Sequence, residues 1–105
     1  MTTIPLPNMI QFPVFCIDNH IKDLNEYEIK SLLYILRYTD AMLKREGVFD
    51  ITVMSEDLRI PHEKLISTLY GLELAWHFIR MDFDRSFSMP NEVKIKPTVW
   101  EEDEK

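Results

Sequence analysis

The chain has one cysteine, Cys16, two glycines and no long apolar run among its 105 residues. A lone cysteine excludes an internal disulfide and is typical of proteins in a reducing compartment. No apolar stretch approaches the roughly 18 residues that a membrane span needs. The first residues also lack the basic and apolar regions of a signal peptide. We therefore expect a cytoplasmic protein.

Positive charge is also in short supply. The sequence has 12 lysines and arginines against 18 aspartates and glutamates, which gives a formal net charge of -6. Part of this acidity lies in residues 101–105, which we expect to form an acidic tail, and the rest of the chain stays mildly acidic. Proteins that bind nucleic acid usually contact phosphates with several lysines and arginines. This chain could do so only if its basic residues gathered on one face.

The composition predicts one domain over residues 1–100. Hydrophobic residues make up 46% of the chain, and no repeat or Gly/Ser linker divides it. Pro5, Pro7 and Pro13 predict that residues 1–20 form an extended arm or edge strand, because proline removes backbone donors. The apolar side chains of this arm need a surface that buries them.

A first long helix is predicted to begin after Asn25. Asn25 is a good N-cap, and Glu28 completes a capping-box pattern. Lys44 and Arg45 suit the last turn, where the helix dipole favours positive charge, and Gly47 suits the position that ends the helix. The apolar residues at helical spacing that we expect to be buried are Ile29, Leu32, Leu33, Leu36 and Leu43.

Two shorter helices follow a predicted strand at Val48–Ile51. Thr52 is placed to cap the second helix, which is expected to end near Leu58, and Pro61 suits the first turn of the third helix. The third helix is expected to bury Leu65, Leu69 and Leu72, with Ile66 at the margin.

The last part of the chain predicts two strands. Trp76–Phe83 is rich in aromatic and β-favouring residues, and Asp84–Asn91 has the composition of a turn. Glu92–Lys96 alternates, with Val93 and Ile95 expected to face inward. With the helices, these strands predict an α+β fold.

The segment Thr52–Leu72, followed by these strands, resembles a helix-turn-helix with a wing. The chain is thus similar to a winged helix, which implies three helices, a small antiparallel wing sheet and, here, an apolar N-terminal arm. Arg59 departs from the pattern, since glycine is common at this turn. The stretch Phe12–Met81, with its apolar arm and capped first helix, resembles the amino-terminal domain of the primosomal protein DnaD and phage and plasmid replication-initiation proteins.

The resemblance implies DNA binding, in regulation or in replication initiation. The third helix would lie in the major groove, and basic residues of the wing would hold phosphates. The alternative is an acidic winged helix that binds a protein or mimics DNA, such as a phage or mobile-element inhibitor of a host nucleic-acid enzyme. The candidate DNA-binding residues are Arg59, His62, Lys64, Ser67, Thr68, Arg85, Lys94 and Lys96.

The surplus of apolar residues in the arm predicts a homodimer. A small domain that exposes aromatic residues often hides them against a second copy. Phe12, Phe15, Tyr34 and Tyr38 are the expected interface. The alternative is that these residues complete the core of the monomer.

We expect no enzyme activity, metal or cofactor. Cys16 and His20 are four residues apart, but the other two histidines lie far along the chain, and a zinc site needs about four ligands at recognisable spacings. A catalytic Cys16 would need an orienting partner, which no pattern indicates.

Overall fold

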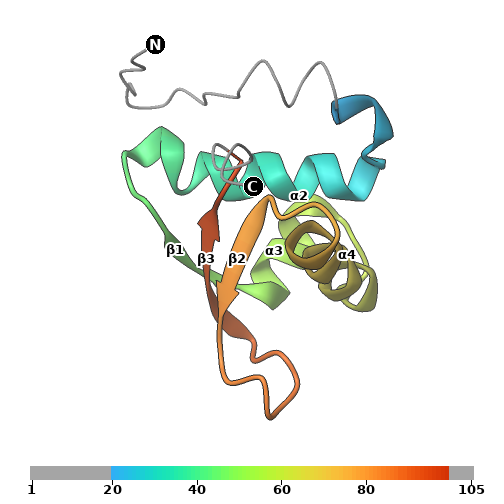
Figure 1. Cartoon of the computed structure of the whole chain (residues 1–105). Coiled ribbons are helices and arrows are strands. Elements are labelled where there is room, and N and C mark those ends of the chain that lie inside the picture. The colour runs from blue at the N-terminus through green and yellow to red at the C-terminus, as the bar shows by residue number, and fades with distance from the viewer. Residues whose placement is uncertain (1–19, 100–105) are drawn as a thin grey trace.

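The computed structural model describes residues 20–99 (Figure 1). The predicted arm, apart from His20, and the predicted acidic tail lie outside these residues. Residues 20–99 contain three α-helices and one three-stranded antiparallel sheet, so the α+β class is confirmed. The elements in order are η1 (Ile21–Asp23), α2 (Glu26–Arg37), η2 (Asp40–Met42), β1 (Gly47–Asp50), α3 (Ile51–Leu58), α4 (His62–Leu74), β2 (Ile79–Asp82) and β3 (Glu92–Pro97).

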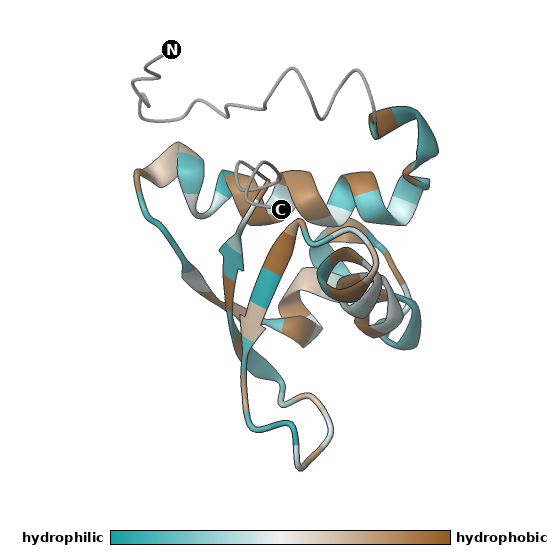
Figure 2. Ribbon diagram, in the orientation of Figure 1, coloured by the Kyte–Doolittle hydropathy of each residue, from teal (hydrophilic) through white to brown (hydrophobic). Residues whose placement is uncertain are grey.

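The central strand of the sheet is β3, in the order β1-β3-β2. Phe49 of β1 lies opposite Val93, and Met81 of β2 lies opposite Ile95. These four side chains are buried on the face that the helices cover, as the alternation expected for β3 predicts. Polar and apolar residues alternate along β2 in Figure 2 for the same reason. The order of helices and strands is compatible with a winged helix.

The predicted start of α2 is confirmed and its predicted end is wrong. The Asn25 side chain accepts from the Glu28 N–H at 2.8 Å, and the Glu28 carboxylate accepts from the Asn25 N–H at 2.8 Å. The helix stops at Arg37, because the Thr39 hydroxyl donates to the Ile35 carbonyl and the chain turns into η2. Leu43, rather than the predicted glycine, adopts the left-handed conformation, with φ 60°.

The buried side of α2 differs in part from the expected stripe. Leu32 and Leu36 are buried as predicted, and Ile35 is buried with them. Leu33 is 41% exposed and Leu43 is 55% exposed. Leu43 lies beyond the shortened helix, and Leu33 lies off the side of α2 that carries Leu32 and Leu36.

The helix α3 is capped by Asp50 rather than by Thr52. An Asp50 carboxylate oxygen accepts from the Val53 N–H at 3.0 Å. The Thr52 hydroxyl instead donates to the side-chain oxygen of Asn91 at 2.8 Å, and the Asn91 carbonyl accepts from the Ile51 N–H. These bonds connect the start of α3 to the residues before β3.

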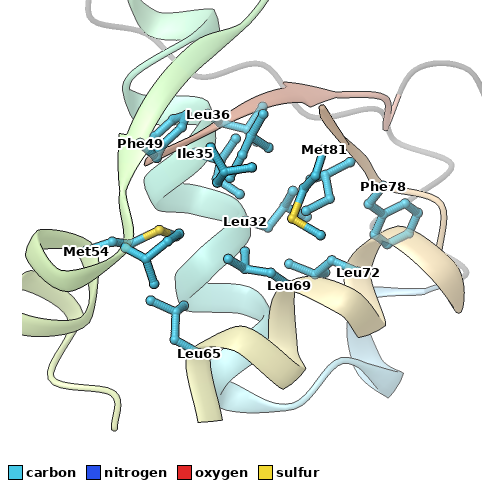
Figure 3. Packing of buried hydrophobic residues seen from close by; sticks show 14 of the residues in the cluster. Leu32, Ile35, Leu36, Phe49, Met54, Leu65, Leu69, Leu72, Phe78 and Met81 are labelled. Atoms are coloured by element: carbon cyan, nitrogen blue, oxygen red, sulfur yellow. The ribbon is translucent and has the colours of Figure 1, made fainter. Parts of the chain in front are cut away.

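The helix α4 buries Leu65, Leu69 and Leu72, as predicted. It begins at His62, one residue later than predicted, with Pro61 as the residue before its first turn. Figure 3 shows these leucines meeting residues of α2, β1, α3 and β2 in one core. The core therefore fixes which side of α4 faces outward.

We predict that Arg59→Gly raises the free energy of unfolding. Arg59 ends α3 in the left-handed conformation, with φ 57°. Glycine adopts this conformation without strain at Cβ, so we expect a gain of roughly 0.5–1 kcal/mol in urea denaturation. Lys64→Gly, at a helical position, should destabilise by up to about 1 kcal/mol. A loss of stability for Arg59→Gly would contradict the interpretation.

We predict that the Asp50 cap weakens in acid. The hydrogen bond from the Val53 N–H, then the bond with the Asn91 side chain, lowers the pKa of Asp50. A carboxylate whose pKa is lowered by folding stabilises the folded state at pH values above its pKa in the unfolded chain, near pH 4. This contribution is lost as the pH falls through the pKa of the folded state. Asp50→Asn keeps an acceptor that does not titrate. The difference in unfolding free energy between the two proteins should shrink between pH 5 and pH 2, and a constant difference would contradict this prediction.

Candidate nucleic-acid interface

The turn between α3 and α4 brings three of the predicted residues to one end of α4. Arg59, His62 and Lys64 are all exposed there. The turn is held by the Ser55 hydroxyl, which donates to the carbonyl of Ile60, while the Ile60 side chain is buried. The left-handed conformation of Arg59 thus reverses the chain and leaves its guanidinium at the surface.

The exposed side of α4 is smaller than predicted. Ser67 is exposed, and its hydroxyl donates to the Lys64 carbonyl at 3.1 Å. Thr68 is only 8% exposed, because it lies on the same side of the helix as Leu65 and Leu72. Thr68 therefore packs with the core and is not available to a ligand.

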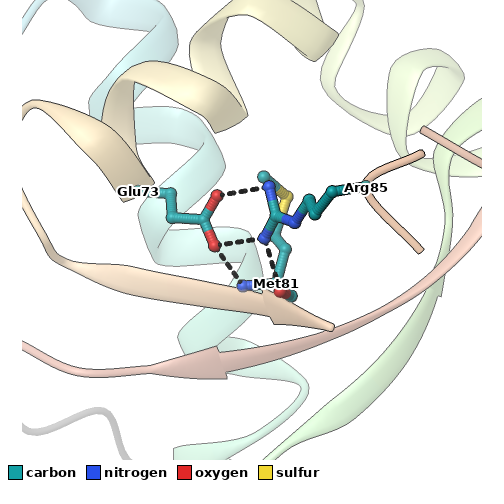
Figure 4. Close-up of polar contacts among 3 residues, drawn as sticks. All are labelled: Glu73, Met81 and Arg85. Carbon is teal, nitrogen blue, oxygen red and sulfur yellow. Dashed lines mark hydrogen bonds and ion pairs between the residues drawn. The ribbon is translucent and has the colours of Figure 1, made fainter. Parts of the chain in front are cut away.

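Arg85 forms an ion pair with Glu73 of the same chain. Its guanidinium donates twice to the Glu73 carboxylate, at 3.0 and 2.7 Å, and once to the Met81 carbonyl at 2.7 Å (Figure 4). Glu73 also accepts from the Met81 N–H at 2.8 Å. The hydrogen bonds that Arg85 donates to Glu73 raise the pKa of Arg85. The pair joins α4 to the loop after β2 and neutralises Arg85, the basic residue of this loop.

Aromatic contacts hold the start of this loop against α4. The Arg85 guanidinium lies 4.1 Å from the centre of the Phe83 ring, and the Phe83 ring lies edge-on to Tyr70 of α4 at 6.4 Å. The start of the loop, at Phe83 and Arg85, therefore lies beside α4. Phe87, which sequence reasoning did not single out, is 73% exposed in this loop.

Lys94 and Lys96 lie elsewhere. They share one face of β3, as predicted, but this face is opposite the one that Val93 and Ile95 bury against the helices. Lys94 pairs with Glu46 at 3.6 Å and lies opposite Asp82 in the register. The predicted DNA-binding residues are thus divided between the α3–α4 turn and the outer face of the sheet.

The two predicted dimer residues within residues 20–99 lie side by side at the end of α2, where Tyr38 directly follows the last helical residue. The rings of Tyr34 and Tyr38 are 4.9 Å apart. The Tyr34 hydroxyl donates to Asp57 of α3 at 2.8 Å. Burial and this bond raise the pKa of Tyr34, which stays protonated as a donor. Phe12 and Phe15 lie outside the described residues, so the dimer interface stays a prediction.

Residues 20–99 include no group of three or more His, Cys, Asp or Glu side chains that could hold a metal ion. Over the same residues, each helix is either too short or too polar to cross a membrane. Cys16 lies outside this part of the chain.

Comparisons with protein-family models, with curated proteins and with solved structures found no match to this chain.

We predict that Glu73 stabilises the fold more than an ordinary surface residue does. Its side chain is 11% exposed and binds both Arg85 and the Met81 N–H. Glu73→Ala should lower the free energy of unfolding by roughly 1.5–3 kcal/mol, the usual range for hydrogen bonds to charged groups. Glu73→Gln keeps an acceptor for the Met81 N–H and should lose less. Equal stability of wild type and Glu73→Ala in urea denaturation would show that the pair contributes nothing.

Proposed function

We propose that this chain binds duplex DNA through the α3–α4 turn and the exposed side of α4, in regulation or in replication initiation. One observation carries the proposal. A three-residue turn joins α3 to α4, and α4 buries one side in the core while Arg59, His62 and Lys64 surround its exposed start. A helix placed in this way can enter the major groove with its N-terminal residues toward the bases.

Some residues of this surface would contact phosphates and others would contact bases. Arg59 and Lys64 donate to phosphate oxygens, and the N-terminal N–H groups of α4 add a partial positive charge. Ser67 lies one turn further along the exposed side, where a hydroxyl can reach a base edge. Glu63 is exposed beside them and repels phosphate, which weakens binding, while the contacts to phosphate make binding sensitive to salt.

The loop at residues 83–91 would act as the wing, and its position supports a duplex that lies along α4. Its start is held against α4 by the Glu73–Arg85 pair and by the contact between Phe83 and Tyr70. A duplex that lies along α4 therefore meets this loop. Arg85, already paired with Glu73, contributes less to phosphate binding than the sequence predicts.

The pairing of basic residues favours a second candidate function. Glu73 neutralises Arg85 and Glu46 pairs with Lys94, while Glu56, Asp57 and Glu63 are exposed around the turn. An acidic surface of this kind suits a basic protein partner, such as the DNA-binding groove of a nucleic-acid enzyme, because complementary charge speeds encounter and selects the partner. This chain would then act as a protein-binding module or DNA mimic.

We predict that Arg59→Ala with Lys64→Ala weakens DNA binding about tenfold or more at low salt. Each lost phosphate contact should reduce the dependence of log K on log salt by about 0.9, so the slope should fall by roughly two units. Fluorescence anisotropy with labelled duplexes measures both quantities. Lys94→Ala with Lys96→Ala removes the same charge from the outer face of the sheet and should leave the slope within about half a unit of the wild-type value.

The controls separate the two candidate functions. Arg59→Gly removes the guanidinium while favouring the fold, so weaker binding by this variant cannot be attributed to unfolding. Equal losses in the two double variants would mean that net charge, rather than the α3–α4 turn, drives binding. If the wild-type protein shifts no duplex at low salt, the DNA proposal fails and the acidic protein-binding function takes its place.

A further inference from the structure

A hollow of about 320 Å³ lies at the surface between α2, β1 and α3. Polar and apolar atoms line it about equally, and Asp50 and Lys44 are among its lining residues. Its apolar lining residues are Tyr34, Tyr38, Met42, Val48, Phe49 and Val53.

The hollow runs beside an edge of the sheet. Within residues 20–99, β1 pairs on one side only, with β3. Val48 of this strand is 66% exposed, and Tyr38, Met42 and Val53 each expose more than two fifths of their surface. Exposed strand edges with apolar neighbours tend to pair with other chains, and native proteins usually cover them. This apolar edge therefore fits an extended apolar segment.

We propose that the segment before His20 covers this edge in the same chain, with the Phe12 side chain in the hollow. Ile10, Phe12 and Val14 alternate, so an extended segment presents all three on one side. Pro13 excludes a central strand but is tolerated at a sheet edge. The phenyl ring of Phe12 matches a hollow bordered by two tyrosines.

The length of the segment allows this contact. The His20 ring lies 5.7 Å from the Phe78 ring, next to the start of β2. Ile79 of β2 and Gly47 of β1 lie two strand spacings apart, and their partners on β3 are two residues apart. The distance across the sheet between them is therefore about 12 Å. The eight residues from Phe12 to His20 span at most roughly 28 Å. Phe12 can therefore reach the hollow of its own chain.

A second copy could offer the same segment, but the tether favours the same chain. A short flexible connection keeps a segment at an effective concentration of about a millimolar or more. The surface also lies apart from the α3–α4 turn, so this proposal does not depend on DNA binding. The exposed apolar residues of α2 and β1 would then be covered within one chain, in line with the alternative from the sequence that the arm completes the core of the monomer.

A nitroxide on Cys16, the only cysteine, tests the proposal in the full chain. The first sample is spin-labelled 15N protein diluted into unlabelled Cys16→Ser protein, which reports contacts within one chain. The second is 15N Cys16→Ser protein mixed with spin-labelled protein, which reports contacts between chains. We expect the amides of Tyr38, Met42 and Val48 to broaden in the first sample and to stay sharp in the second. Broadening of these amides in the second sample alone would assign the segment to a second copy and overturn the proposal, as would their sharpness in both.

Two pairs of variants sharpen the test. Phe12→Asp and Val48→Lys should each abolish the broadening, because one removes the ring and the other places a charge beside the hollow. Phe15→Asp and Leu74→Lys are the matched controls. In an extended segment Phe15 lies on the side opposite Ile10, Phe12 and Val14, and Leu74 is an apolar residue on α4 about as exposed as Val48. The same spectra show whether each variant folds. Loss of broadening in the controls as well, or its persistence in Phe12→Asp, would contradict the assignment of Phe12.

Discussion

The burial of one face of β3 is the constraint on which the rest of the structure depends. Val93 and Ile95 are 1% and 0% exposed, because α2 and α4 close over them with their leucines. Since side chains alternate along a strand, Lys94 must point to the other face. The same core turns Leu65 and Leu69 of α4 inward and so turns Lys64 outward. One packing requirement thereby places Lys64 and Lys94 on two separate surfaces.

Most of the fold follows from local signals that the sequence displays directly. The capping box at Asn25, the spacing of Leu65, Leu69 and Leu72 and the alternation of Glu92–Lys96 each depend on residues within a few positions of one another. The predicted end of α2 failed because the Thr39 hydroxyl competes for the Ile35 carbonyl, a bond that any threonine in a helix could make.

The candidate site was harder to predict because its residues are positioned by distant partners. Thr68 has the polarity of a surface residue, yet the side of α4 that it occupies is buried by helix packing. Arg85 has the appearance of a phosphate-binding wing residue, but Glu73, twelve positions earlier, binds it. No spacing rule links these two residues, because the β2 strand and the following turn bring them together. Sequence patterns therefore locate the helices and strands but do not show which charged side chains another residue of the chain binds.

The conformation of Arg59 bears on the choice between DNA and a basic protein as the partner of this chain. A left-handed residue other than glycine costs on the order of 1–2 kcal/mol, and the Arg59 side chain is exposed. An arginine that keeps this conformational cost at an exposed turn favours a role for the Arg59 side chain itself. At physiological salt the screening length is about 8 Å, so the charges around the α3–α4 turn matter more than the net charge of the chain. There the exposed Arg59 and Lys64 stand against the exposed Glu56, Asp57 and Glu63, so acidic groups outnumber basic ones and the proposed phosphate binding would be weak.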